Sequence, residues 1–310
     1  MKPRRSILSV PGHVEKMHRK AAGCAADVVM LDLEDSVPVD AKEDARRQVI
    51  RSVLEIDWGD KTLTFRSNAL DTPFGYRDLL EVLEAAGDRL DAVVIPKIDH
   101  PGDIHFVHRL MAGIEMRLGG RRPVGIEASV ESAKGLSRVR EIAAASDRLV
   151  SLIFGIVDLQ VSIGARLVSI SGHGEAEESI YPGHRWNFAM SRMVMAAKAA
   201  GLAAIDAPYG HFRDQEALRR WAAVAAALGF DGKWAIHPDQ IEAINEVFSP
   251  STEEIKRARK VLDAFQAAAA HRRGAVAVDG RMVDGATIRL ARRTWELALQ
   301  LGLAGEGEGS

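Results

Sequence analysis

The sequence lacks several features that would assign it to a particular class of protein. Its single cysteine, Cys24, cannot form an internal disulfide, so we expect a reducing, cytoplasmic compartment and an inert thiol. It has no uninterrupted apolar run of the roughly 18 residues that a membrane helix needs, and the stretch Ile7–Val10 is too short for a signal-peptide core. A formal net charge of −2 provides no general field for attracting nucleic acid or an anionic membrane. An anionic ligand must therefore be held by a local site.

The composition is that of an ordinary folded protein. Hydrophobic residues make up 47% and charged residues 27% of the 310 residues, which is enough apolar surface to bury a large core. A length of this size is compatible with two domains, but a closed α/β barrel uses about 250 residues as one domain.

Short apolar runs rich in β-branched residues alternate with longer segments of helical period. We expect helices over these longer segments, which include Val14–Ala22, Ala41–Leu54, Tyr76–Ala86, Asp103–Arg117, Ala133–Ala145, Ala189–Ala200 and Gln215–Leu228. Runs that are apolar at consecutive positions suit parallel strands covered by helices on the outside. A doubly wound open sheet is the competing architecture, but no G-x-G-x-x-G motif follows the first run. The pattern therefore predicts a (β/α)8 TIM barrel. The eight predicted strands are Ser6–Val10, Val28–Leu33, Thr62–Phe65, Ala92–Pro96, Val124–Val130, Leu149–Phe154, Ala203–Ile205 and Trp234–Ile236.

The chain is too long for the barrel alone. We expect the barrel over residues 1–248, a C-terminal helical lid extension over residues 249–304 and a disordered tail over residues 305–310. Gly274 and Gly280 lie between the predicted helices of the extension and make it a candidate mobile lid.

Charged side chains follow most of the predicted strands. In barrels of this kind the active site lies at the carboxyl ends of the strands, so these side chains are the candidates for chemistry. The candidates, in chain order, are Asp32, Glu34, Asp35, Arg66, Lys97, Glu131, Asp158, Asp206 and His237.

Two of these carboxylates suggest a metal site. Glu127, Ser129 and Glu131 share a parity, so the fifth strand would direct all three into the barrel. Gly155 precedes Asp158 and could let its carboxylate approach Glu131. Two carboxylates completed by water and substrate oxygens suit Mg²⁺, with Mn²⁺ as an alternative, better than zinc. The alternatives are that Glu131 caps the next helix or that the carboxylates form a structural ion pair with Arg66.

The cationic candidates each allow more than one interpretation. Arg66 could bind a carboxylate, a phosphate or a developing oxyanion, or could pair with Asp32 or Glu34. Lys97 could be a Schiff-base lysine or a phosphate contact, but we favour an ion pair with Asp32. His237, before Pro238, is typical of a hydrogen-bonded positioning group.

These motifs together resemble one family, the HpcH/HpaI aldolases and citrate lyase β-subunits. The resemblance covers nearly the whole chain and rests on ordered motifs that start at Arg4, Asp32, Phe65, Val94, Glu131, Phe154, Ala235 and Val278. It implies a (β/α)8 barrel, a bound Mg²⁺, a coenzyme A thioester and a homotrimer or homohexamer whose C-terminal lid covers a neighbour's site. Segments Tyr181–Trp186 and Ile205–Phe212 look more like malyl-CoA lyases than citryl-CoA lyases.

The resemblance also implies roles for individual residues. Glu131 and Asp158 match the metal ligands, and Arg66 matches the arginine that steadies the thioester enolate. Asp284 matches an acid/base aspartate that reaches into the adjacent subunit, with Asp279 as the second choice. Contacts to the coenzyme would come from the set Arg5, Lys97, His237 and Pro238.

The function implied is reversible Claisen-type cleavage of a 3-hydroxyacyl-CoA such as malyl-CoA, giving glyoxylate and acetyl-CoA. The alternatives are a citryl-CoA or citramalyl-CoA lyase, a malyl-CoA thioesterase and a CoA-independent class II pyruvate aldolase. A catalytically silent homologue that serves as a subunit or sensor is a further alternative. No nucleic-acid or membrane partner is expected.

Overall fold

A computed structural model of the chain describes residues 2–120, 122–166, 185–270, 276–278 and 281–305. The chain divides into two compact units, one spanning Arg4–Asn245 and the other residues 1–3 with 246–310. None of the helices in the described ranges is long and apolar enough to cross a membrane.

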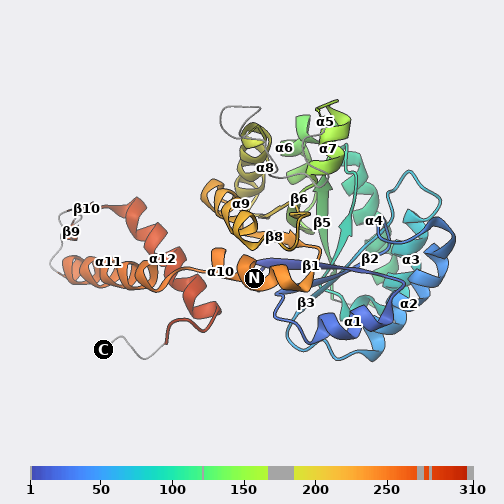
Figure 1. Cartoon of the computed structure of the whole chain (residues 1–310), viewed down its shortest axis with the longest axis horizontal. Coiled ribbons are helices and arrows are strands. Elements are labelled where there is room, and N and C mark those ends of the chain that lie inside the picture. The colour runs from blue at the N-terminus through green and yellow to red at the C-terminus, as the bar shows by residue number, and fades with distance from the viewer. Residues whose placement is uncertain (1, 121, 167–184, 271–275, 279–280, 306–310) are drawn as a thin grey trace. The chain divides into compact units, whose positions relative to one another are not determined.

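The first unit is a closed barrel of eight parallel strands in sequential order, as predicted (Figure 1). Each strand pairs with the next, and β1 also pairs with β8 to close the ring. Buried apolar runs form these strands because helices cover their outer faces. The strands are β1 (Ser6–Pro11), β2 (Val28–Asp32), β3 (Thr62–Arg66), β4 (Ala92–Ile95), β5 (Gly125–Val130), β6 (Leu149–Phe154), β7 (Ala203–Asp206) and β8 (Gly232–Ala235).

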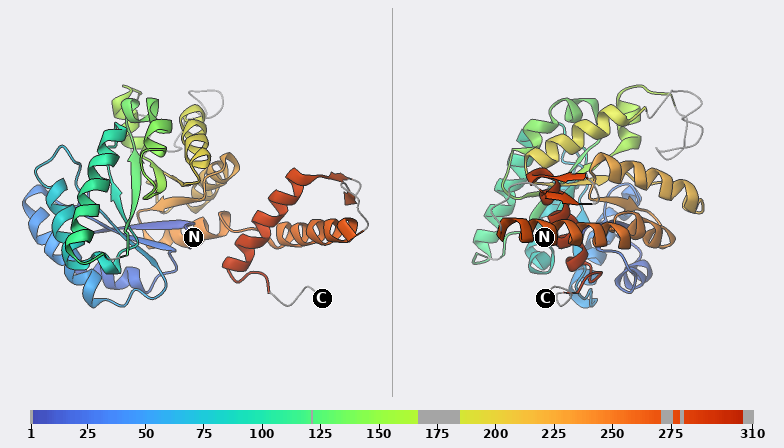
Figure 2. Two further views of the ribbon diagram at one scale, coloured as in Figure 1. Left: turned by 180° about the vertical axis from the view of Figure 1, so that it is seen from behind. Right: turned by 90° about the vertical axis from the view of Figure 1, so that its left-hand side faces the viewer.

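Helices lie around the outside of the strands, as both views of the barrel show (Figures 1 and 2). Most lie where the period of the sequence predicts them. They are α1 (Glu15–Ala22), α2 (Lys42–Glu55), α3 (Gly75–Ala86), α4 (Pro101–Arg117), α5 (Ala133–Ser137), α6 (Val139–Ala143), α7 (Ile156–Ser162), α8 (Asn187–Ala199), α9 (Gln215–Leu228) and α10 (Ile241–Val247).

Two helical predictions were wrong in detail. The single helix expected over Ala133–Ala145 is two short helices, α5 and α6, that meet at Arg138. Helix α7 was not predicted, because its seven residues are too few to display a helical period.

The barrel interior is apolar in its middle layer and polar towards both ends. Towards the amino ends of the strands, the interior holds an ion pair between Arg4 and Glu127. Glu127 also accepts a 3.0 Å hydrogen bond from Ser151. Because β5 directs alternate residues inward, Glu127 lies near the amino end of the strand and Glu131 just beyond its carboxyl end. The apolar cluster consists of Ile7, Val28, Met30, Val94, Ile153, Ala203, Ile205 and Trp234.

The second unit is built from two long helices and a short hairpin. Helices α11 (Thr252–Ala270) and α12 (Gly285–Gln300) lie side by side, as Figures 1 and 2 show. Strands β9 (Val276–Val278) and β10 (Arg281–Val283) pair antiparallel between them, a hairpin that the sequence did not predict. A small apolar core joins these elements, with Val278 and Val283 from the hairpin packed against Val261 and Ile288 from the helices.

Candidate active site

Arg66, the last residue of β3, lies at the centre of a cluster of carboxylates. Its Nε and Nη2 donate to the two oxygens of Asp32 at 2.6 and 2.8 Å. Its Nη1 lies 2.7 Å from Glu34 and 3.2 Å from Asp35. Burial alone would raise the pKa of Asp32, but the Arg66 guanidinium and the hydrogen bonds from Ser36 hold it below its ordinary value. The ion-pair alternative for Arg66 is therefore present in the structure.

Lys97 is paired with Glu34, so the favoured pairing with Asp32 was wrong. The Lys97 Nζ lies 2.9 Å from Glu34 Oε1, whereas both oxygens of Asp32 are taken by Arg66. Burial works against the ammonium, but the Glu34 carboxylate outweighs it and raises the pKa of Lys97. A Schiff-base lysine needs a lowered pKa, so the geometry argues against that interpretation.

Glu34 is itself buried, and its surroundings disfavour the charged form of its carboxyl group. Burial raises its pKa to about 7 against the opposing effect of Arg66, and the neighbouring Asp35 charge adds to the rise. A carboxyl that titrates near neutral pH beside two cations is typical of functional sites.

Glu131 follows β5 and turns into the mouth of the barrel. Its Oε1 accepts a 2.6 Å hydrogen bond from the main-chain N–H of Lys97, and Ser129 donates to its Oε2 at 3.1 Å. It does not cap the next helix, because the Ser132 side chain accepts the N–H of Gly135 and fills that role. Burial and the charge of Asp158 both raise the pKa of Glu131.

Asp158 lies in the first turn of α7, directly after β6, and is half-buried. The register places Val130 of β5 opposite Phe154 of β6, so the residues that follow them, Glu131 and Gly155, are neighbours. A Cβ at Gly155 would lie only 2.3 Å from both Cβ and Oε2 of Glu131. Gly155 thus matters because it leaves room for Glu131, rather than for backbone flexibility.

Glu131 and Asp158 fit a hard divalent cation. Glu131 is disfavoured as a free anion, and Asp158 has no hydrogen bond or ion pair among the described contacts, so a dication would relieve both. Within the described ranges no group of three or more His, Cys, Asp or Glu residues is placed to hold a metal ion, so a cation at this pair would complete its shell with water and substrate oxygens. Two carboxylates with open positions suit Mg²⁺.

The predicted coenzyme contacts fall into two groups. His237 and Pro238 follow β8 at the carboxyl end of the barrel, where the His237 ring stacks on Phe212 at 4.5 Å and accepts the N–H of Asp239. Arg5 precedes β1 at the opposite end, where Asp27 binds its main-chain N–H and its guanidinium. Arg5 does not join the other predicted residues.

Asp284 belongs to the second unit, where it caps the amino end of α12. Its carboxylate is exposed and accepts the N–H groups of Ala286 and Thr287, each at 3.0 Å. Hydrogen bonds from Thr287 and Ala286 lower the pKa of Asp284, so it is ionised at neutral pH. Asp279 and residues 181–184 lie outside the described residues.

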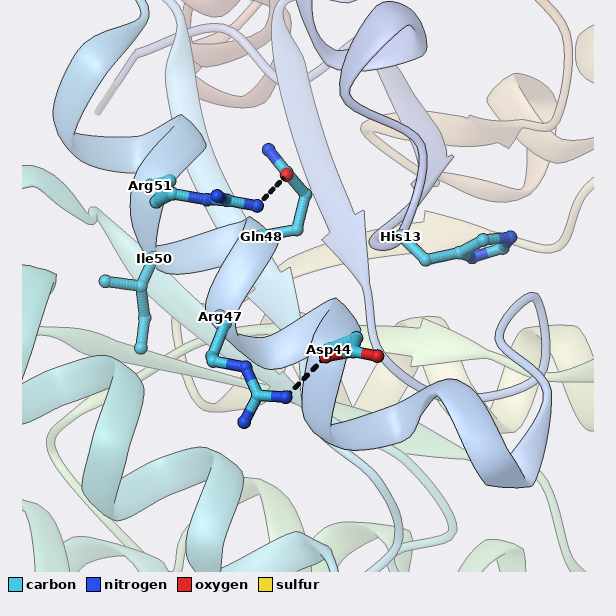
Figure 3. A pocket seen from close by; sticks show the side chains of 6 residues that line it. All are labelled: His13, Asp44, Arg47, Gln48, Ile50 and Arg51. Carbon is cyan, nitrogen blue, oxygen red and sulfur yellow. Dashed lines mark hydrogen bonds and ion pairs between the residues drawn. The ribbon is translucent and has the colours of Figure 1, made fainter.

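A hollow of about 560 Å³ lies between α2 and the turn after β1 (Figure 3). Arg47 and Arg51 project from α2, where Asp44 and Gln48 respectively bind them, and His13 stands apart across the hollow. The hollow shares no residue with the cluster around Arg66, so it is a separate basic surface at the same end of the barrel.

The fold and the site define the class, a (β/α)8 barrel with a carboxylate pair suited to a divalent cation beside a buried arginine. The profile of the family described as HpcH/HpaI aldolase/citrate lyase matches residues 5–238. The chain belongs to that family. An L-malyl-CoA/beta-methylmalyl-CoA lyase from Cereibacter sphaeroides is 43% identical over 94% of this chain and 93% of its own.

Two further relatives bear on function. A (3S)-malyl-CoA thioesterase from Cereibacter sphaeroides is 35% identical over 94% of this chain and 93% of its own. The crystal structure of a CitE protein from Mycobacterium tuberculosis in complex with magnesium, acetoacetate and coenzyme A is 31% identical, with a TM-score of 0.74. That likeness covers 96% of this chain and 98% of the CitE chain.

Proposed function

We propose that the protein is a Mg²⁺-dependent carbon–carbon lyase that cleaves a 3-hydroxyacyl-CoA such as malyl-CoA reversibly into glyoxylate and acetyl-CoA. The observation that carries this proposal is a buried Glu131 near Asp158, which has no ion pair or hydrogen bond within the described part of the chain, close to Arg66, in a chain 43% identical to a malyl-CoA lyase. The related CitE structure is a complex with magnesium, acetoacetate and coenzyme A, which supports a metal site and a coenzyme A site in this protein.

Glu131 and Asp158 would hold the metal. A Mg²⁺ ion bound by these carboxylates would act as a Lewis acid and would lower the pKa of the substrate hydroxyl. Asp284 then accepts the hydroxyl proton, the bond between the hydroxyl-bearing carbon and the carbon next to the thioester breaks, and its electron pair forms the acetyl-CoA enolate. Return of that proton from Asp284 to the enolate carbon completes acetyl-CoA, so no proton is gained or lost overall.

Arg66 stabilises the enolate oxygen. Its guanidinium is oriented by the bidentate pair with Asp32 and lies 5.1 Å from the centre of the Trp234 ring. Of its remaining contacts, the one to Asp35 is the longest, and Asp35 is 61% exposed, so a ligand oxygen can replace it. Stabilising charge at such a position contributes about 3–4 kcal/mol to lowering a barrier of this type.

Asp284 would be supplied by a second copy of the chain. It lies in the C-terminal unit, which has its own small core, and its exposed, ionised carboxylate is available to a neighbour's site. We infer a homo-oligomer, a trimer or hexamer, in which the unit formed by residues 246–305 completes the adjacent barrel. Mixing Glu131→Gln subunits with Asp284→Ala subunits tests this, because exchange should restore activity that neither variant has alone. Absence of restored activity in mixed oligomers would place Asp284 outside the neighbour's site.

The coenzyme would enter at the mouth formed by Lys97, His237 and Pro238. The basic hollow of His13, Arg47 and Arg51 lies at the same end of the barrel and suits the phosphates of the coenzyme. Arg5, at the other end, has no part in the proposal. The double variant Arg47→Ala/Arg51→Ala should weaken binding of coenzyme A without changing binding of glyoxylate, and equal losses for both ligands would exclude the hollow.

A thioesterase that hydrolyses malyl-CoA to malate and coenzyme A is the second candidate, because a relative of that name is 35% identical. The two functions differ in the bond that breaks, so their products separate them. A panel of malyl-, methylmalyl- and citramalyl-CoA, each with Mg²⁺ present or withheld, should yield a 2-oxo acid and an acyl-CoA. Release of free thiol without the 2-oxo acid would establish the thioesterase.

A further inference from the structure

Lys97 has an unusual backbone. Its φ of 54° lies in the left-handed region, and among the described residues only glycines share a positive φ with it. A side chain in this region strains the backbone, and strain of this kind persists where the surroundings enforce it, often at functional sites.

The conformation directs the main chain of Lys97 at a neighbouring strand. The Lys97 N–H donates to Glu131 Oε1 at 2.6 Å, and the next N–H, from Ile98, donates to the carbonyl of Ser129 at 3.0 Å. Successive amides of one turn thus bind a side chain and a carbonyl at the end of β5. Glu131 is confined from the other side by Gly155, where no Cβ could fit.

The side chain of Lys97 leads away from Glu131. Its Nζ lies 2.9 Å from Glu34, which is 7% exposed and also lies 2.7 Å from Arg66. The ammonium therefore anchors the turn to the arginine cluster, while the main chain contacts the carboxylate.

We propose that Lys97 is a positioning residue for Glu131, and that it acts through its strained main-chain amide rather than through its charge. This inference rests on the proposed function, in which Glu131 holds a divalent cation. The Lys97 N–H holds one oxygen of the Glu131 carboxylate in place and so orients the other oxygen. Hydrogen bonds to a metal-binding side chain commonly orient it towards the metal in this way. The positive φ is what brings the N–H to the carboxylate.

Two substitutions separate the main chain from the ammonium. Lys97→Gly removes the ammonium but adopts a positive φ freely, whereas Lys97→Val removes the same charge and strongly disfavours that φ. The readout is the dissociation constant of Mg²⁺ from the substrate-free protein, measured by isothermal titration calorimetry. We expect Lys97→Val to weaken binding by about tenfold and Lys97→Gly to stay within about twofold of the wild type.

Three controls accompany the pair. Glu131→Gln should abolish binding, and Lys256→Val, at an exposed position of α11, should leave it unchanged. Circular dichroism and thermal unfolding without metal check that each variant folds. If Lys97→Val does not fold, Lys97→Ala replaces it, with an expected loss of about fivefold.

The outcomes distinguish this inference from the function on which it rests. Equal weakening in Lys97→Gly and Lys97→Val would assign the effect to the ammonium and overturn the inference. Wild-type affinity in Lys97→Val, with binding lost in Glu131→Gln, would overturn it too and leave the metal site intact. Unchanged affinity in Glu131→Gln would overturn the metal site, and the role of Lys97 with it.

Discussion

Replacing Gly155 with alanine tests the arrangement of the carboxylates most simply. The φ of Gly155 is −97°, which alanine adopts without strain, so the effect comes from the added methyl group alone. That Cβ would lie 2.3 Å from Cβ and Oε2 of Glu131, where ordinary contacts begin at 3.4 Å. Because Glu131 Cβ is attached to the end of β5, the side chain cannot rotate out of this clash, and the carboxylate must move by about 1 Å.

The displacement has two measurable consequences. Overpacking of this kind costs about 1–3 kcal/mol of folding stability, measurable by urea unfolding. A misplacement of about 1 Å at a reacting group can cost on the order of 100-fold in rate, so kcat for malyl-CoA cleavage should fall by about that factor. Gly113→Ala is the matched control, because nothing lies within 4 Å of its added Cβ on α4. A Gly155→Ala enzyme with wild-type kcat and Mg²⁺ affinity would refute the reasoning.

Three further predictions concern charges. The pKa of Glu34 is raised from 4.5 to about 7 by burial, against Arg66 and Lys97, so the stability it contributes is complete below pH 4.5 and lost as pH rises through 7. The wild type should therefore lose on the order of 3 kcal/mol relative to Glu34→Gln over that interval in urea unfolding, and parallel pH profiles would contradict this. Glu127→Gln leaves the buried Arg4 without a counter-charge and should lower the free energy of unfolding by about 3–5 kcal/mol in the same measurement. A loss below about 1 kcal/mol would mean that water hydrates the Arg4 guanidinium in the variant and would contradict the prediction. Asp284→Asn keeps a side-chain oxygen for the α12 cap but cannot accept a proton. The stability of the C-terminal unit should therefore change little, while cleavage of malyl-CoA is lost. Retained cleavage would show that Asp284 is not the base.

The barrel could be predicted from the sequence because its signals are local. The apolar runs overlap all eight strands, although β8 starts two residues before its run, and the rule that sites lie at strand ends points to Arg66 and Glu131. The pairing of Lys97 with Glu34 could not be predicted from the sequence. Arg66 occupies both oxygens of Asp32 in the folded barrel, and only the three-dimensional arrangement shows that Lys97 pairs with Glu34 instead. The role of Gly155 was also hidden, because a clash with a side chain on the neighbouring strand leaves no trace in the composition around either residue.

The short elements were missed for a related reason. Helix α7 and the hairpin of β9 and β10 are too short to show a period, and the hairpin is stabilised by packing on the flanking helices α11 and α12. The break between α5 and α6 at Arg138 likewise falls inside a segment whose composition suits one helix.

The central claim is that the Glu131 and Asp158 pair supports metal-dependent carbon–carbon cleavage. The most direct test follows glyoxylate and acetyl-CoA together during turnover of malyl-CoA by the purified protein as Mg²⁺ is titrated, in the wild type and in Asp158→Asn. The account predicts equal amounts of both products, a rate that rises with Mg²⁺ to saturation, and loss of this response in Asp158→Asn. Free coenzyme A and malate as the products, or an Asp158→Asn enzyme with the wild-type response to Mg²⁺, would contradict it.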